Sequence, residues 1–297
     1  MKGLRIITPV KDSIELTLQT IKAVMESEIN VPFKYVVYND FSTPENTAKL
    51  EEASKELGFE LINLSSMTTH PSPNYLLVLQ HSQQEALASD YGLEIVESDV
   101  VVERNTLQEL FNGASERTDC GIAAAVTVDD QGEVNYPYLY AKKMKEGVFE
   151  SKKHCSFCCS LLTPAFLAAF DFRQLDETKN WYDVTISHES LNKGFKNYLF
   201  TCLKVIHRPH SSRPWKLLKY TNPLKYYWIK FTKGYDKIYS FRLHAFSEQE
   251  ISSAHFFMLN FCYELGAFTL LYMFFAGQSL CFCIFREIFY IFVIRRP

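Results

Sequence analysis

The 297-residue sequence lacks the features that mark several classes of protein. Its first residues, "MKGLRIITPVKDS", hold only a few apolar positions before Pro9 and no small-residue cleavage site. We therefore predict no secretory signal and expect a cytosolic protein. No internal repeat or low-complexity segment is present. Because 47% of the residues are hydrophobic and 22% are charged, the composition is that of a globular protein.

The spacing of the eight cysteines does not give the two Cys-x-x-Cys pairs of common structural zinc sites. In the cytosol we expect them to be reduced. His154, Cys155 and Cys158 lie close enough in sequence to offer three metal ligands. Burial as small apolar side chains explains these cysteines more simply, and we interpret them as core residues.

Patterns of strand and helix alternate along the chain. Strands are predicted over 4–10, 34–40, 59–64, 92–102, 120–128 and 195–206, and helices over 13–25, 43–58, 80–90, 104–114, 163–170 and 181–194. The second helix is the best defined, with Thr43 as N-cap, Pro44 in its first turn and Gly58 as its terminator. This alternation predicts an α/β fold with a mainly parallel sheet and helices on both faces. The ligand crevice of such a fold lies at the carboxyl ends of its strands.

Two acids interrupt the apolar stretch "GLEIVESDVVV" at residues 92–102. Glu97 and Asp99 stand two residues apart, a spacing that points both side chains the same way from an extended backbone. Converging carboxylates repel each other and lose solvation, so they favour a compensating cation. Oxygen ligands suit Mg²⁺ or Mn²⁺, which complete their coordination with substrate phosphates. The pair therefore indicates a metal and a diphosphate ligand, and the alternative is a solvated turn.

Four separated stretches resemble, in order, the motifs of a family 2 glycosyltransferase with the GT-A (Rossmann-like) fold. They are "IITPVKD", "VVYNDFST", "ESDV" and "WYDVTISHESLNKGF", the last followed by "VIHRPHSS". The resemblance covers residues 1 to about 212. It implies inverting transfer of a sugar from a nucleotide-diphosphate sugar to a hydroxyl acceptor, of the kind found in bacterial surface-glycan synthesis.

The resemblance also implies roles for individual residues. The nucleotide sugar would be bound by Thr8, Pro9, Val10, Asp12, Asn39, Asp40, Glu97 and Ser98. Asp99, Glu97 and His207 would hold Mn²⁺ or Mg²⁺, with His210 as the alternative to His207. Asp183 would be the general base, because it matches the acid at the start of the family's last motif.

Some positions depart from the family pattern. Tyr182 and Thr185 stand where further acids are common around the base. The alternative function is therefore a non-catalytic sugar-nucleotide-binding or scaffold protein of a glycan assembly complex. A nucleotidyltransferase would want a Gly-rich phosphate loop near the N-terminus, which the sequence lacks.

Residues 215–297 differ in character from residues 1–214, the predicted glycosyltransferase domain. This tail carries 10 Lys and Arg against 5 Asp and Glu and is rich in aromatic residues, which suits an anionic membrane surface. It is too apolar for a nucleic-acid arm. Residues 265–285 have no charge and could span a bilayer, but polar interruptions favour helices that lie in the membrane interface. A buried helical subdomain or a homo-oligomer contact is the alternative. We therefore expect a peripheral protein on the inner face of the cell membrane that acts on a glycan or lipid-linked acceptor.

Overall fold

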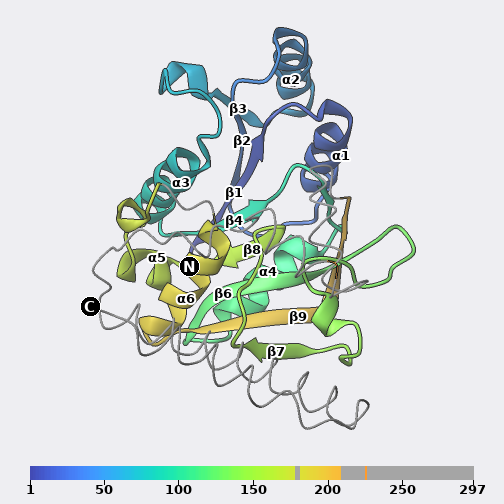
Figure 1. Cartoon of the computed structure of the whole chain (residues 1–297), viewed down its shortest axis with the longest axis vertical. Helices are drawn as coiled ribbons and strands as arrows, with labels where there is room; N and C mark the ends of the chain where they lie inside the picture. The colour runs from blue at the N-terminus through green and yellow to red at the C-terminus, as the bar shows by residue number, and fades with distance from the viewer. Residues whose placement is uncertain (178–180, 209–224, 226–297) are drawn as a thin grey trace, which may run out of the picture. The chain divides into compact units, whose positions relative to one another are not determined.

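A computed structural model describes residues 1–177, 181–208 and 225. The residues up to 208 form a mixed α/β unit around a nine-stranded sheet (Figure 1). The predicted tail over 215–297, with its membrane helices and oligomer contacts, lies outside the described residues except for Lys225. Within the described ranges, no helix combines the length and apolar composition that a membrane span requires.

Strands and helices alternate in the first half of the unit, as predicted. The elements are β1 (Gly3–Val10), α1 (Ile14–Met25), β2 (Phe33–Asn39), α2 (Pro44–Leu57), β3 (Glu60–Asn63), α3 (Tyr75–Ser89) and β4 (Tyr91–Val96), with a 3-10 turn η1 at Leu64–Ser66. β1 pairs in parallel with both β2 and β4, and β2 pairs in parallel with β3. The carboxyl ends of these four strands therefore meet at one edge of the sheet.

The second half of the unit is mixed in strand direction. Its elements are β5 (Val100–Val101), α4 (Thr106–Ser115), β6 (Cys120–Val128), β7 (Val148–Ser151), β8 (Cys159–Leu162), α5 (Pro164–Ala169), α6 (Tyr182–Asn192) and β9 (Lys196–His207), with 3-10 turns η2 (Leu139–Ala141) and η3 (Phe172–Gln174). The strand order is β3-β2-β1-β4-β8-β6-β9-β5, and β7 pairs with β9. β9 runs parallel to β6, whereas β8 is antiparallel to both of its neighbours.

The prediction of a mainly parallel sheet is therefore correct for β1 to β4 and for β6 with β9, whereas β5, β7 and β8 pair antiparallel with their neighbours. Residues 129–158, between β6 and β8, contain β7 and η2 but no α-helix. A parallel neighbour needs a crossover that carries the chain back to the starting edge, usually through a helix. Without that helix, β8 enters the sheet from the opposite end. Neither β7 nor β8 was predicted, and α3 begins five residues earlier than the predicted start at residue 80.

Helix α2 begins and ends at the residues that its sequence predicts. The side chain of Thr43 accepts a hydrogen bond from the backbone N–H of Asn46 at 3.3 Å, and Pro44 opens the helix. Gly58 closes it with φ of +81°, a left-handed conformation that is nearly free of steric penalty only for glycine. The predicted cap residues are confirmed.

Helices cover both faces of the sheet, which confirms that prediction. Buried residues of α1, α2 and α4 share one apolar cluster with β1, β4 and β6, including Ile21, Leu50 and Leu110. Buried residues of α3, α5 and α6 share the opposite cluster, including Leu79, Phe166 and Ile186. Accordingly, α1 and α3 lie on opposite sides of β1 and β2 (Figure 1).

The predicted strand over 92–102 is broken at its two acids. β4 ends at Val96, and the backbone N–H of Val100 donates to the carbonyl of Glu97 at 3.2 Å, which closes a turn. β5 then pairs with β9, so the chain changes partner strands across Glu97–Asp99. The two carboxylates thus occupy the carboxyl end of β4, where the sequence pattern placed them.

Candidate active site

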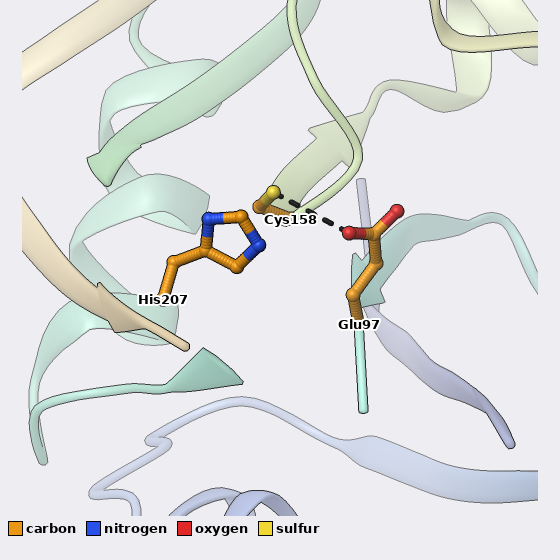
Figure 2. A group of neighbouring side chains, drawn as sticks. All are labelled: Glu97, Cys158 and His207. Atoms are coloured by element: carbon orange, nitrogen blue, oxygen red, sulfur yellow. Dashed lines mark hydrogen bonds between the residues drawn. The ribbon is translucent and has the colours of Figure 1, made fainter. Parts of the chain in front are cut away.

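Three segments that are distant in sequence meet beyond the end of β4. Val96 of β4 lies opposite Cys159 of β8, and Val100 of β5 lies opposite His207 of β9. These pairings bring together Glu97, Cys158 and His207, whose side-chain ligand atoms all lie within 4.8 Å of one another. The three side chains point toward a common centre (Figure 2). The predicted metal residues Glu97 and His207 are therefore neighbours in the structure.

The ring of His207 is held by the loop between β6 and β7. Its Nδ1 lies 2.8 Å from the carbonyl oxygen of Tyr136, and a carbonyl can only accept, so Nδ1 carries a proton. Asn135 donates to the carbonyl of His207 at 2.9 Å, which fixes the backbone as well. The other ring nitrogen, Nε2, is directed at Asp99 Oδ2 at 3.6 Å. A hydrogen bond like that of Nδ1 to the Tyr136 carbonyl is typical of metal-ligating histidines, because it fixes the ring and its tautomer and leaves the other nitrogen for the metal.

Electrostatics couple His207 to the two acids. Burial lowers the pKa of His207, but the hydrogen bond and charge of Asp99, together with the charge of Glu97, outweigh burial and raise it above its ordinary value. Burial also raises the pKa of Glu97 to about 7, with a further contribution from the charge of Asp99 and an opposing one from His207. Positive charge at this position therefore stabilises two converging carboxylates, as the sequence pattern predicts for a cation site.

The turn that carries the acids is attached to both neighbouring strands. Glu97 donates its backbone N–H to the carbonyl of Cys158 at 3.0 Å. The carbonyl of Asp99 accepts from the backbone N–H of Arg208 at 2.9 Å. Ser98, predicted as a nucleotide-sugar contact, is buried between them with 8% of its surface exposed. These two backbone hydrogen bonds hold the turn that carries the Asp99 carboxylate.

Cys158 was interpreted from the sequence as a core residue, and that interpretation is incomplete. The thiol is buried, but its sulfur lies 3.4 Å from Glu97 Oε2 and donates to it. Cys155, by contrast, packs in the core, and its backbone N–H donates to Ser187 Oγ at 2.9 Å. The one metal-capable group found among the described residues joins Cys158 to Glu97 and His207 rather than to His154 and Cys155.

Asp183, the predicted base, lies in the first turn of α6. Its Oδ1 accepts from the backbone N–H of Val184 at 2.9 Å. The Asp183 charge contributes to the raised pKa values of both Glu97 and Tyr75, which places the three groups within electrostatic reach. The structure therefore brings Asp183 to the same region as the acids after β4.

Tyr75 is a candidate that the sequence analysis did not single out. It begins α3, and its ring lies 6.1 Å from that of Tyr182 at the start of α6. Its hydroxyl is buried and has no hydrogen-bond partner among the described residues. Burial, and then the charges of Glu97 and Asp183, raise its pKa well above the ordinary value. An unpaired buried hydroxyl beside these acids is a ready hydrogen-bonding group for a ligand. Nothing in the local sequence around residue 75 distinguishes it from a core tyrosine.

The predicted nucleotide residues at the end of β1 and in the loop after it mostly support the local structure. Thr8 is buried and its hydroxyl lies 2.9 Å from that of Tyr35. Val10 packs in the core, and Pro9 between them is partly exposed. Asp12 Oδ1 accepts from the backbone N–H of Thr43 at 2.8 Å, which ties the loop after β1 to the start of α2.

The predicted nucleotide residues at the end of β2 also support the local structure. Asn39 donates to Asn63 at 2.8 Å and is buried. Asp40 Oδ2 accepts from Ser72 Oγ at 2.7 Å and from the backbone N–H of Asn74 at 2.9 Å, while Oδ1 accepts from the Asn74 side chain at 2.8 Å. Asp40 therefore anchors the segment that leads into α3. The alternative metal ligand His210 lies outside the described residues.

The residues present fit a divalent cation. Nitrogen, oxygen and sulfur donors lie within 4.8 Å of one another, Nδ1 of His207 is already hydrogen-bonded, and Asp99 stands beside Nε2. A bound cation is stabilising beside two acids, because it offsets the repulsion between their negative charges.

Comparison with solved structures identifies the class of fold as that of GT-A-type glycosyltransferases. The mannosyltransferase PcManGT from Pyrobaculum calidifontis, solved with GDP-Man and Mn²⁺, aligns over 77% of this chain with a TM-score of 0.52 and 12% identity. GalNAc-T7, solved with UDP, GalNAc and Mn²⁺, aligns over 70% with a TM-score of 0.53 and 13% identity. TarS 1-349 from S. aureus aligns over 73% with a TM-score of 0.52 and 14% identity.

These likenesses show a shared fold. The chain spans 64%, 44% and 62% of the three proteins, which is less than two thirds of each. No protein-family model matches the sequence, and no curated protein matches it either.

Proposed function

We propose that the protein is a metal-dependent glycosyltransferase that moves a sugar, with inversion, from a nucleotide-diphosphate sugar to a hydroxyl. The observation that carries this proposal is the meeting of Glu97, Asp99 and His207 at the end of β4, within electrostatic reach of Asp183. The GT-A-type fold supports it, because ligands of open α/β sheets bind at the carboxyl ends of strands. The Mn²⁺ in the structures of PcManGT and GalNAc-T7 also supports it.

In this proposal, Asp183 accepts the proton of the acceptor hydroxyl. The hydroxyl oxygen forms a bond to the anomeric carbon while the bond from that carbon to the diphosphate oxygen breaks, and the electron pair leaves with the diphosphate. Attack from the face opposite the diphosphate inverts the anomeric centre without a covalent enzyme intermediate. A divalent cation held by Glu97, Asp99 and His207 would supply positive charge for the departing diphosphate.

The position of Asp183 suits a base. The positive end of the α6 dipole and the Val184 N–H both favour the ionised carboxylate, which is the form that accepts a proton. Tyr75 could hydrogen-bond the sugar or the acceptor from the facing end of α3.

The wider role is also part of the proposal. The basic, aromatic composition of 215–297 supports attachment to the inner face of the cell membrane and an acceptor that is a lipid-linked or surface glycan. We expect the full chain to float with vesicles that contain anionic lipid and to float less as salt is raised. A chain that remains unbound at low salt would contradict membrane attachment and leave the transfer reaction untouched.

The first experiment is the thermal shift of the detergent-solubilised full chain with UDP, GDP, CDP or TDP, each with and without Mn²⁺. We expect one nucleotide to raise the melting temperature only with Mn²⁺, and Asp99→Asn to abolish that rise. Asp90→Asn is the matched control, because Asp90 precedes β4 at the opposite end from Glu97 and pairs with Lys2 at the surface.

Asp183→Asn separates binding from catalysis. It should keep the nucleotide-dependent shift and abolish sugar transfer. If no nucleotide shifts the wild-type chain, a non-catalytic scaffold of a glycan assembly complex becomes the better description. If Asp183→Asn retains transfer, the assignment of the base is wrong.

A further inference from the structure

The donor set at the end of β4 includes sulfur, which an oxygen-loving cation does not require. Cys158 Sγ lies 3.4 Å from Glu97 Oε2 and belongs to the same group of ligand atoms as His207. In Figure 2 the thiol and the imidazole approach the carboxylate from different strands. Cys158 is only 2% exposed, so its thiol is buried beside these two side chains.

The separation of these atoms matches coordination by one ion. With Zn–S of about 2.3 Å and Zn–O of about 2.1 Å, tetrahedral geometry separates sulfur and oxygen by about 3.6 Å. The observed 3.4 Å between Cys158 and Glu97 is close to this value. The present thiol-to-carboxylate hydrogen bond therefore holds both donors at the spacing that an ion between them needs.

The protein also holds the thiol in place. The carbonyl of Cys158 accepts from the backbone N–H of Glu97 at 3.0 Å, so backbone and side chain join the same two residues. The hydroxyl of Ser156 also lies 3.3 Å from the sulfur. This arrangement resembles the outer shell that orients metal ligands, as the Tyr136 carbonyl does for His207.

We propose that Cys158 is a sulfur ligand of the cation site and that the site therefore takes Zn²⁺ in preference to Mg²⁺. The inference rests on the cation site of the proposed function and adds a ligand and a metal preference to it. On binding, the thiol gives its proton to solvent, and the thiolate, His207 Nε2 and Glu97 coordinate the ion, with Asp99 beside them. Thiolate and imidazole favour Zn²⁺, whereas Mg²⁺ prefers an octahedral shell of oxygens.

Cobalt is the probe, because Co²⁺ occupies zinc sites and a sulfur ligand produces an intense charge-transfer absorption in the near ultraviolet. The reduced full chain is titrated with Co²⁺ without nucleotide. We expect this absorption in the wild type, its loss in Cys158→Ser, and its retention in Cys202→Ser. Cys202 is an exposed thiol of β9 and therefore the matched control. An absorption that is absent in the wild type, or that survives in Cys158→Ser, overturns the proposal.

Competition tests the metal preference. Zn²⁺ should displace bound Co²⁺ at concentrations at least tenfold below those at which Mg²⁺ does. In Cys158→Ser, the ratio of the displacing Mg²⁺ concentration to the displacing Zn²⁺ concentration should be at least tenfold smaller. Equal displacement by Zn²⁺ and Mg²⁺ in the wild type contradicts the preference.

A second measurement serves if Cys158→Ser does not fold. X-ray absorption at the zinc edge of Cys202→Ser protein loaded with one equivalent of Zn²⁺ should show a sulfur neighbour at about 2.3 Å. A shell of nitrogen and oxygen alone overturns the proposal.

Failure here is distinct from failure of the proposed function. Nucleotide binding that depends on Mn²⁺ and Asp99, together with a shell free of sulfur, leaves the transferase proposal standing and removes only the role of Cys158. A sulfur-ligated ion without binding of any nucleotide removes the transferase proposal and keeps the metal site.

Discussion

At the scale of single residues, removal of the Tyr75 hydroxyl tests whether this group binds a ligand or supports the fold. It is buried without a partner among the described residues, so Tyr75→Phe should leave the free energy of unfolding unchanged or raise it by up to about 1 kcal/mol. If the hydroxyl binds donor or acceptor, the same variant should lower kcat/KM for transfer by roughly 5- to 10-fold. Urea unfolding and steady-state kinetics measure the two effects.

Tyr138→Phe is the matched control for Tyr75→Phe. The Tyr138 hydroxyl is also buried but accepts from the backbone N–H of Ser156 at 2.8 Å. Its removal leaves that donor unpaired and should lower the free energy of unfolding by about 1–3 kcal/mol. Equal losses in both variants would show that the Tyr75 hydroxyl has a structural partner.

Glu94 of β4 predicts a dependence of stability on pH. Its carboxyl is fully buried, and neither oxygen has a partner among the described residues. Burial raises its pKa well above 4.5, so the folded protein keeps this proton at pH values where the unfolded chain has released it. The native state then binds more protons than the unfolded state, and the Glu94 contribution to stability falls as pH rises above about 4.5.

Glu94→Gln removes this titration. The difference in unfolding free energy between Glu94→Gln and wild type should grow in favour of the variant by about 1.4 kcal/mol per pH unit above pH 5, until the folded carboxyl ionises. Urea unfolding at pH 5, 6 and 7 measures this slope. Glu109→Gln, on the exposed side of α4, should show no such slope. A flat difference for Glu94→Gln would mean that Glu94 is ionised in the folded state.

At the scale of elements, the two helices that begin with Thr-Pro differ in the burial of their N-cap residues. Thr43 caps α2 at the surface, and Thr43→Ala should lower the free energy of unfolding by about 1 kcal/mol. Thr163 caps α5 in the interior, where its side chain accepts from Phe166 and also donates to the Cys120 carbonyl at 2.7 Å. Thr163→Ala should therefore lower it by about 2–3 kcal/mol.

Serine distinguishes the hydroxyl from the methyl group at both caps. Thr163→Ser and Thr43→Ser keep the capping oxygen and should recover most of the loss measured for alanine in chemical denaturation. If Thr163→Ser is as unstable as Thr163→Ala, packing of the methyl group accounts for the effect, and the cap does not.

At the scale of the whole molecule, the proposed cation site joins two halves of the sheet. Glu97 and Asp99 follow β4 of the parallel half, whereas His207 ends β9 of the mixed half. An ion that binds only the folded protein should raise the free energy of unfolding by about 2.7 kcal/mol when its concentration is 100 times its dissociation constant. Scanning calorimetry with Mn²⁺ or Zn²⁺, before and after EDTA, measures this change.

His207→Ala should remove most of the metal-dependent rise in melting temperature. His188→Ala is the control, because His188 is exposed on α6 and belongs to no ligand group found among the described residues. A metal-dependent rise that is unchanged in His207→Ala would place the ion elsewhere.

Prediction from sequence succeeded where the decisive interactions are local. Thr43 and Gly58 bound α2 because caps act on backbone groups within a few residues. The first two strands were found because burial between two helical layers leaves near-continuous apolar runs. The position of Glu97 and Asp99 at a strand end followed from two acids that interrupt such a run. These features account for the first half of the fold and for half of the candidate site.

The remaining features depend on contacts between distant segments. The direction of β8, the turn at Glu97 where the chain changes partner strands, and the use of Asp40 to anchor residues 72–74 were not predicted. Tyr75 likewise gained its setting only from the approach of α6 to α3. Each of these depends on which strands and helices become neighbours, and local propensity carries no information about that choice.

The sequence by itself therefore determined an α/β chain with acids at the end of β4, because period, capping and charge act over a few residues. The family resemblance already grouped His207 with Glu97, but only the tertiary structure decided that Cys158 would stand beside Glu97, 61 residues away. The antiparallel pairing of β4 with β8 and of β5 with β9 is the physical reason. It brings three strand ends to one point, and a side chain becomes a ligand only where the other donors meet it.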